Sequence, residues 1–88
     1  MTESDCARAV ERLQGELAEL GVSRTYRSVS GDMSVLSVWY DLVVWCREGR
    51  FLWRAGPDFT TAASYPADDP AGAAERVYER YQELREIP

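Results

Sequence analysis

The alternation of hydrophobic and polar positions is strongest in residues 34–54, which contain all three tryptophans. The even-numbered positions of residues 36–46 are all apolar, whereas the odd-numbered positions are mixed. Because successive side chains of a strand point to opposite faces, this pattern predicts one buried face and one partly exposed face. The run is too long for one straight strand in a small domain, so we expect a bend or a split near Tyr40 and Asp41.

A hairpin is predicted at the end of this run, where residues 48–49 read Glu-Gly. Glycine tolerates a positive φ and suits a two-residue turn. The turn places Cys46 opposite Phe51 on the buried face and Trp45 opposite Leu52 on the other face. A slip of one residue would expose the buried set, so this register is strongly specified.

Amphipathic helices are predicted on both sides of the strands. The first, residues 3–20, follows a Thr-x-x-Asp start signal, carries apolar residues three or four apart and ends before Gly21. The second, residues 70–86, has Asp69 at its N-cap and Pro70 at its first position. Both stripes predict packing against the sheet.

Two further segments have weaker patterns. A strand before the central run is expected to put Tyr26 on the core face, opposite Leu36 and across a three-residue turn. Residues 56–69 have no periodicity, and a connection of this length is usually functional or disordered. Phe59 and Tyr65 within it are candidates to pack over the core or to line a pocket.

The sequence therefore predicts a single small α+β domain in the order helix-strand-strand-strand-helix. Its antiparallel sheet has three strands, or four if the long strand splits, and both helices cover the even-numbered face. The expected elements are a helix at 3–20, strands at about 22–29, 33–47 and 50–55, a loop at 56–69, and a helix at 70–86.

Composition narrows the possible partners. The chain has 88 residues, ten basic and fifteen acidic side chains and a net charge of −5. This acidic balance argues against nonspecific nucleic-acid binding and against anionic membrane surfaces. No signal-peptide pattern opens the chain and no long apolar run occurs, so we expect a cytoplasmic protein. All basic residues are arginine, which we interpret as codon bias in a GC-rich bacterial genome.

Catalytic and metal-ligating residue types are scarce. The chain has no histidine, which removes the commonest general base and the usual activator of a serine or cysteine nucleophile. No metal-ligand spacing is present, so we expect no enzyme activity, no cofactor and no metal. Asp41 is interpreted as a turn residue rather than a functional acid. Cys6 and Cys46 are interpreted as reduced core residues, with a disulfide or redox pair as the alternative.

The odd-numbered face of the sheet is the candidate functional surface. An exposed apolar patch with aromatic and arginine content is typical of a protein interface. We therefore predict a non-enzymatic protein–protein interaction domain, regulatory, adaptor-like or chaperone-like, that forms a homodimer through this face. The alternative is that residues 56–69 fold back and cover it. The candidate interface residues are Trp39, Val43, Trp45, Leu52, Arg47, Arg50 and Arg54.

The sequence leaves two other functions open. A small-molecule domain would bind an organic anion between the sheet and the loop, beside Phe59 and Tyr65. The element order resembles that of double-stranded RNA-binding domains, which contact phosphates through a lysine-rich helix start and a histidine-bearing loop. Here the matching segments read Ala-Asp-Asp-Pro at residues 67–70 and Ser-Gly-Asp at residues 30–32. Nucleic-acid binding is therefore a remote alternative. A small acidic α/β dimer that binds a client chain, which is one form of the predicted interaction domain, resembles bacterial secretion chaperones in general character.

Overall fold

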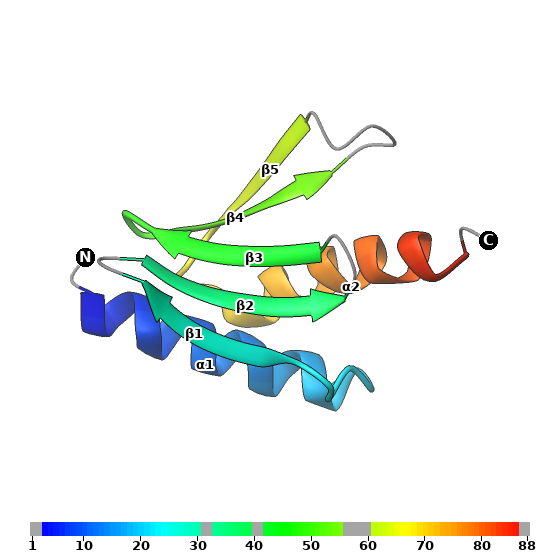
Figure 1. Ribbon diagram of the computed structural model, residues 1–88, viewed down its shortest axis with the longest axis horizontal. Helices are drawn as coiled ribbons and strands as arrows, with labels where there is room; N and C mark the ends of the chain where they lie inside the picture. The colour runs from blue at the N-terminus through cyan, green and yellow to red at the C-terminus, as the bar shows by residue number, and fades with distance from the viewer. Residues whose placement is uncertain (1–2, 31–32, 40–41, 56–60, 87–88) are drawn as a thin grey trace.

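The computed structural model describes residues 3–30, 33–39, 42–55 and 61–86. Five strands form one antiparallel sheet in chain order, and both helices lie on the same side of it (Figure 1). The predicted α+β class and helix placement are confirmed, but the sheet has five strands rather than three or four. The elements are α1 (Glu3–Glu19), β1 (Tyr26–Ser30), β2 (Met33–Trp39), β3 (Leu42–Arg47), β4 (Arg50–Ala55), β5 (Thr61–Pro66) and α2 (Pro70–Glu86).

The core lies between the sheet and the two helices. On the sheet side it is formed by the even-numbered apolar positions of β2 and β3, as the alternation predicts. Phe51 and Trp53 continue this face on β4. The helices contribute their apolar stripes, of which the buried members are Cys6, Ala9, Val10, Leu13 and Leu17 from α1, and Ala73, Ala74 and Val77 from α2.

The long alternating run is split into two strands that pair with each other. β2 and β3 form an antiparallel pair in which Val35 lies opposite Trp45 and Leu36 lies opposite Val44. The expected split is therefore confirmed, whereas Tyr40 and Asp41 themselves lie outside the described residues.

The turn between β3 and β4 has the predicted register. Cys46 pairs with Phe51 and Trp45 pairs with Leu52. Glu48 and Gly49 have φ angles of 52° and 81°. Positive φ at both central residues is the requirement of a type I′ turn, whose twist matches that of the flanking strands.

The register of β1 differs from the prediction by one residue. Tyr26 pairs with Ser37 rather than with Leu36, and residues 22–25 are not part of a strand. The cause is the connection to β2, because Ser30 already pairs with Met33 and only two residues lie between them. A one-residue shift moves every side chain to the other face, so Tyr26 is 77% exposed instead of lying in the core.

The predicted loop at 56–69 is wrong over much of its length. Thr61–Pro66 forms β5, which pairs with β4 from Ala55 opposite Thr61 to Arg50 opposite Pro66. Its small and polar side chains give no alternation, but the backbone pairing of an edge strand does not require one. Residues 56–60, including Phe59, lie outside the described residues.

The start of α2 is held by a contact with β5. Asp69 Oδ1 accepts a hydrogen bond from the Gly72 backbone N–H at 3.2 Å, which is the predicted N-cap. Asp69 Oδ2 accepts a second hydrogen bond from the Tyr65 hydroxyl at 2.8 Å. This bond raises the Tyr65 pKa above its ordinary value. A Cβ atom at Gly72 would collide with the Tyr65 hydroxyl and with Asp69 Oδ2, so a larger residue here would displace the two side chains that form this contact.

Candidate functional site

The face of the sheet opposite the helices, called here the outer face, carries most of the predicted interface residues. One residue from each of the five strands forms a row across the middle of this face, called here the middle row, because each of these residues pairs with the next one on the neighbouring strand. The row is Ser28, Val35, Trp45, Leu52 and Ser64. The apolar members are half-buried against one another and lie within reach of neighbours in the adjacent rows.

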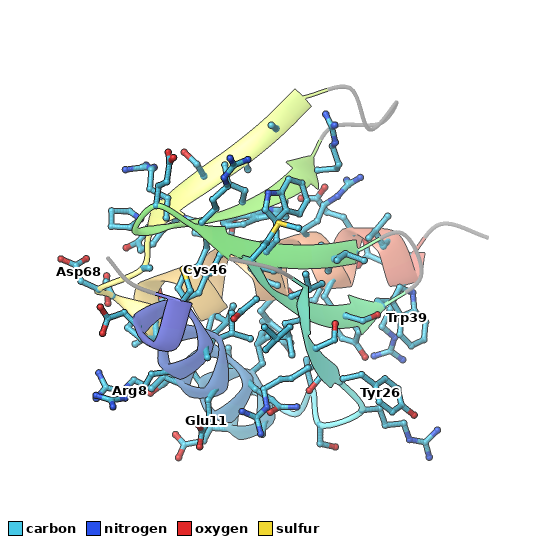
Figure 2. All side chains as sticks on the ribbon, turned by 60° about the vertical axis from the view of Figure 1, so that its left-hand side comes forward. Arg8, Glu11, Tyr26, Trp39, Cys46 and Asp68 are labelled. Atoms are coloured by element: carbon cyan, nitrogen blue, oxygen red, sulfur yellow. The ribbon has the colours of Figure 1, made fainter. Side chains whose placement is uncertain are left out.

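Further side chains on the outer face flank the middle row. Val43 is 38% exposed on β3, two positions before Trp45. It pairs with Ser37, which in turn pairs with Tyr26, so an exposed tyrosine lies at the edge of the same face. Figure 2 shows the Tyr26 side chain pointing away from the body of the molecule.

Three arginines complete the outer face. Arg47 and Arg50 lie directly opposite each other across the β3–β4 pair, and all three arginines are exposed. Arg54 follows the inward-facing Trp53 and therefore points outward. Arg50 Nη2 donates a hydrogen bond to Ser64 Oγ at 3.1 Å. Like charges directly opposite each other on a sheet are unfavourable, so the arrangement favours an anion above this pair.

The charge of the outer face is opposite in sign to that of the chain. Among the described residues, none of the side chains that alternation places on this face is acidic. The face carries three positive charges, whereas the whole chain has a net charge of −5. The remainder of the molecule therefore has a net charge of −8, and the arginines form a separate positive region.

Trp39 does not join the outer face, which corrects the prediction for this residue. The β2–β3 register shifts between Ser37 and Trp39, so the parity of the alternation is lost at the end of β2. The Trp39 ring instead lies 5.4 Å from the Tyr81 ring of α2, edge-to-face at 87°. The structure therefore brings together Val43, Trp45, Leu52, Arg47, Arg50 and Arg54 and separates Trp39 from them.

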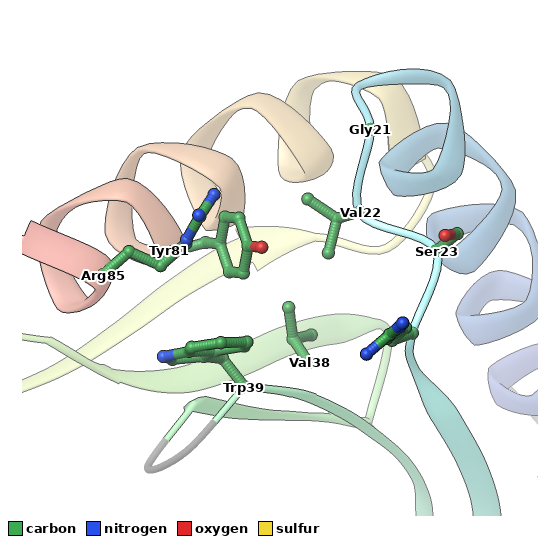
Figure 3. A pocket seen from close by; sticks show the side chains of 8 residues that line it. Gly21, Val22, Ser23, Val38, Trp39, Tyr81 and Arg85 are labelled. Atoms are coloured by element: carbon green, nitrogen blue, oxygen red, sulfur yellow. The ribbon is translucent and has the colours of Figure 1, made fainter.

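Trp39 lines a pocket of about 270 Å³ between the end of β2, the segment after α1 and the last turns of α2 (Figure 3). Two arginines, Arg24 and Arg85, border it, and the Arg85 guanidinium lies 5.5 Å from the centre of the Tyr81 ring. The remaining lining residues are Gly21, Val22, Ser23 and Val38. The sequence did not reveal this pocket, because the parity pattern placed Trp39 on the other face.

The pocket predicted beside Phe59 and Tyr65 is not formed by the described residues. Phe59 lies outside them, and Tyr65 is bonded to Asp69 at the first turn of α2. The pocket beside Trp39 lies near the last turns of the same helix instead.

Within residues 3–30, 33–39, 42–55 and 61–86, no group of three or more histidine, cysteine or acidic side chains is arranged to hold a metal ion. No helix of the described chain is long and apolar enough to cross a membrane. No family model matches the sequence, and comparison with curated proteins and with solved structures gave no match. The candidate sites therefore rest on their geometry and charge.

Proposed function

We propose that this protein is a non-enzymatic interaction domain whose outer face binds an acidic segment of another protein. The observation that supports this most is the set of three exposed arginines around Trp45 and Leu52. Tryptophan and arginine are the residue types most enriched among those that dominate binding energy at interfaces. In an acidic chain, such a positive region favours partners with carboxylates.

The arginines also bear on the homodimer expected from the sequence. Two copies meeting through their outer faces would bring both sets of three arginines together, with no carboxylate from the described part of either face. Like-charge juxtaposition across an interface costs several kcal/mol. An acidic partner would instead neutralise the Arg47–Arg50 pair. We therefore favour a heterologous partner over a second copy.

The dimensions of the outer face favour a segment rather than a whole domain. Five strands spaced about 4.8 Å apart and about six residues long give a footprint of roughly 20 by 20 Å. This is about half of the roughly 800 Å² per partner that a standard interface buries. We expect a short acidic segment with at least one large apolar side chain to pack beside Trp45, and dissociation constants in the micromolar range.

A displayed peptide library selected against the wild-type protein tests the proposal. Enriched peptides should combine carboxylates with aromatic or aliphatic residues. Their affinity should fall at least about tenfold, or about 1.4 kcal/mol, when Arg47, Arg50 and Arg54 are replaced together by glutamate. A matched control replaces three exposed helix arginines by glutamate, which gives the same change in net charge. These are Arg8, Arg12 and Arg76.

Affinity should stay within about twofold in the control variant, because its substitutions lie away from the outer face. Equal losses in both triple variants would mean that only net charge matters and would contradict the proposal. Enriched peptides without acidic residues would contradict it as well. Light scattering on the same samples tests whether a second copy binds the outer face instead. In that case the mass should double as the protein concentration rises, and Trp45→Glu should restore the monomer mass.

A second candidate function is supported by the pocket beside Trp39. Two aromatic rings with Arg24 and Arg85 at the rim suit a small aromatic carboxylate, as the organic-anion alternative predicts, although at a different place. We expect at least one of a panel of such carboxylates to raise the Tm. The rise should be smaller in Arg24→Gln and Arg85→Gln but unchanged in Arg76→Gln. A panel without any shift would remove this candidate.

A further inference from the structure

The two cysteines of the chain meet in the core, although they lie 40 positions apart. Cys6 is in the first two turns of α1, and Cys46 is on the helix-facing side of β3. Their Sγ atoms are 2.6 Å apart, and Cys6 and Cys46 are 3% and 0% exposed. Figure 2 shows the Cys46 position on β3. The sequence had left open whether these residues are separate apolar side chains or a pair.

We propose that Cys6 and Cys46 form a reversible disulfide that joins α1 to the sheet when the protein meets a small disulfide oxidant. A disulfide bond is about 2.05 Å long, so the two sulfur atoms need to approach by only about half an ångström. The existing packing already brings the two elements together at this point. No large rearrangement of α1 against β3 is therefore required.

The two thiols have different roles in the reaction. Burial, together with the hydrogen bond to Cys6, raises the pKa of the Cys46 thiol to about 12. The thiolate is the attacking form, so Cys46 is not the first thiol to react. Cys6 lies close to the end of a helix, where local opening costs the least free energy. We infer that the oxidant reaches Cys6 first, when the first turns of α1 open.

The reaction then follows ordinary thiol–disulfide exchange. The Cys6 thiol gives up its proton, and its sulfur attacks one sulfur of glutathione disulfide. The S–S bond of the oxidant breaks, and one glutathione leaves as a thiol. When α1 closes, Cys46 sulfur loses its proton and attacks Cys6 sulfur, which releases the second glutathione thiol. Two protein thiols are thereby oxidised to one disulfide, and one glutathione disulfide is reduced to two thiols.

The expected consequence is a large rise in stability. The crosslink closes a long loop and removes conformations from the unfolded chain. For a domain of this size, the rise in Tm should be roughly 10 °C or more. Reduction by dithiothreitol should return the Tm to its original value.

The experiment incubates the native protein with glutathione disulfide and then measures mass, free thiols and Tm. We expect a monomer that has lost two hydrogen atoms, has no free thiol after unfolding and melts at the higher temperature. Cys6→Ala and Cys46→Ala are the controls, and alanine keeps the replaced positions apolar. Incubation with glutathione disulfide should not raise the Tm of either control. Cys46→Ala should accumulate a mixed disulfide between glutathione and Cys6.

Three results would overturn the proposal. In the first, the wild type keeps both thiols after prolonged incubation, while an unfolded sample reacts readily. In the second, oxidation yields only glutathione adducts or linked dimers. In the third, the wild type forms the internal disulfide but its Tm does not rise. The bond would then distort the fold, which contradicts a crosslink that fits the native geometry.

Discussion

Two adjacent valines of β3 provide a direct test of the assignment of the two sheet faces. Val44 is fully buried against the helices, whereas Val43 is 38% exposed on the outer face. Replacing each by alanine makes the same chemical change one residue apart in the same strand. Both variants lose a β-branched side chain from the same strand, so the difference between them reports mainly the packing and burial of the two faces.

The magnitudes follow from the burial of each side chain. Val44→Ala removes two methyl groups worth about 0.8 kcal/mol each. It also leaves a cavity of about 50 Å³, which adds about 1.2 kcal/mol at ~24 cal/mol per Å³. The total is about 2–3 kcal/mol. Val43→Ala loses at most about 1 kcal/mol, because its methyl groups are partly solvated and leave no enclosed cavity.

Urea unfolding measures this difference. With a slope of about 1 kcal/mol per M for a small domain, the midpoint of Val44→Ala should lie about 1–3 M below that of Val43→Ala. Equal midpoints, or a lower midpoint for Val43→Ala, would refute the assignment. Such a result would mean that the outer face is covered as thoroughly as the inner one.

The remaining predictions concern the corner between β5 and α2 and the paired thiols. Gly72→Ala should destabilise the protein although alanine is the better helix former by about 1 kcal/mol, because its Cβ would meet the Tyr65 hydroxyl and Asp69 Oδ2. Part of this loss should be recovered in a Tyr65→Ala background, in which only the Asp69 contact is left, and urea midpoints of the four proteins check this. The Tyr65 pKa is raised by the hydrogen bond to Asp69, so the stability from this bond is complete below about pH 10 and is lost as the pH rises through the folded-state pKa. The urea midpoint of wild type should therefore fall more than that of Tyr65→Phe as the pH rises above about 10, and parallel losses would contradict this. The free energy of unfolding of the oxidised wild type should be about 4 kcal/mol higher than that of the reduced form. An unchanged urea midpoint would contradict this.

The predictable part of the fold is the part that burial specifies. The even-numbered face of β2 and β3, the Cys46–Phe51 register and the Asp69 N-cap all follow from side-chain pattern or local turn chemistry. A one-residue error at these places would expose the core or leave helix donors unsatisfied. The sequence therefore carries a strong signal for each of them.

The missed features depend on backbone pairing at the edges of the sheet. β1 has exposed side chains from Tyr26 to Val29, so burial does not fix its register. β5 has mostly small residues and is held by its pairing with β4. Trp39 changed faces through a register shift that no side-chain pattern reveals. The pocket beside Trp39 was missed for the same reason.

The three tryptophans allow one measurement to test the proposed function directly. Trp45 lies on the outer face, Trp39 lines the pocket and Trp53 is buried in the core. Each indole N–H gives its own signal in a two-dimensional ¹H–¹⁵N spectrum. Titration with an acidic peptide from the selection should shift the Trp45 signal and leave the Trp53 signal in place. A shift confined to Trp39 would place binding in the pocket, and an unchanged Trp45 signal under saturating peptide would contradict docking on the outer face.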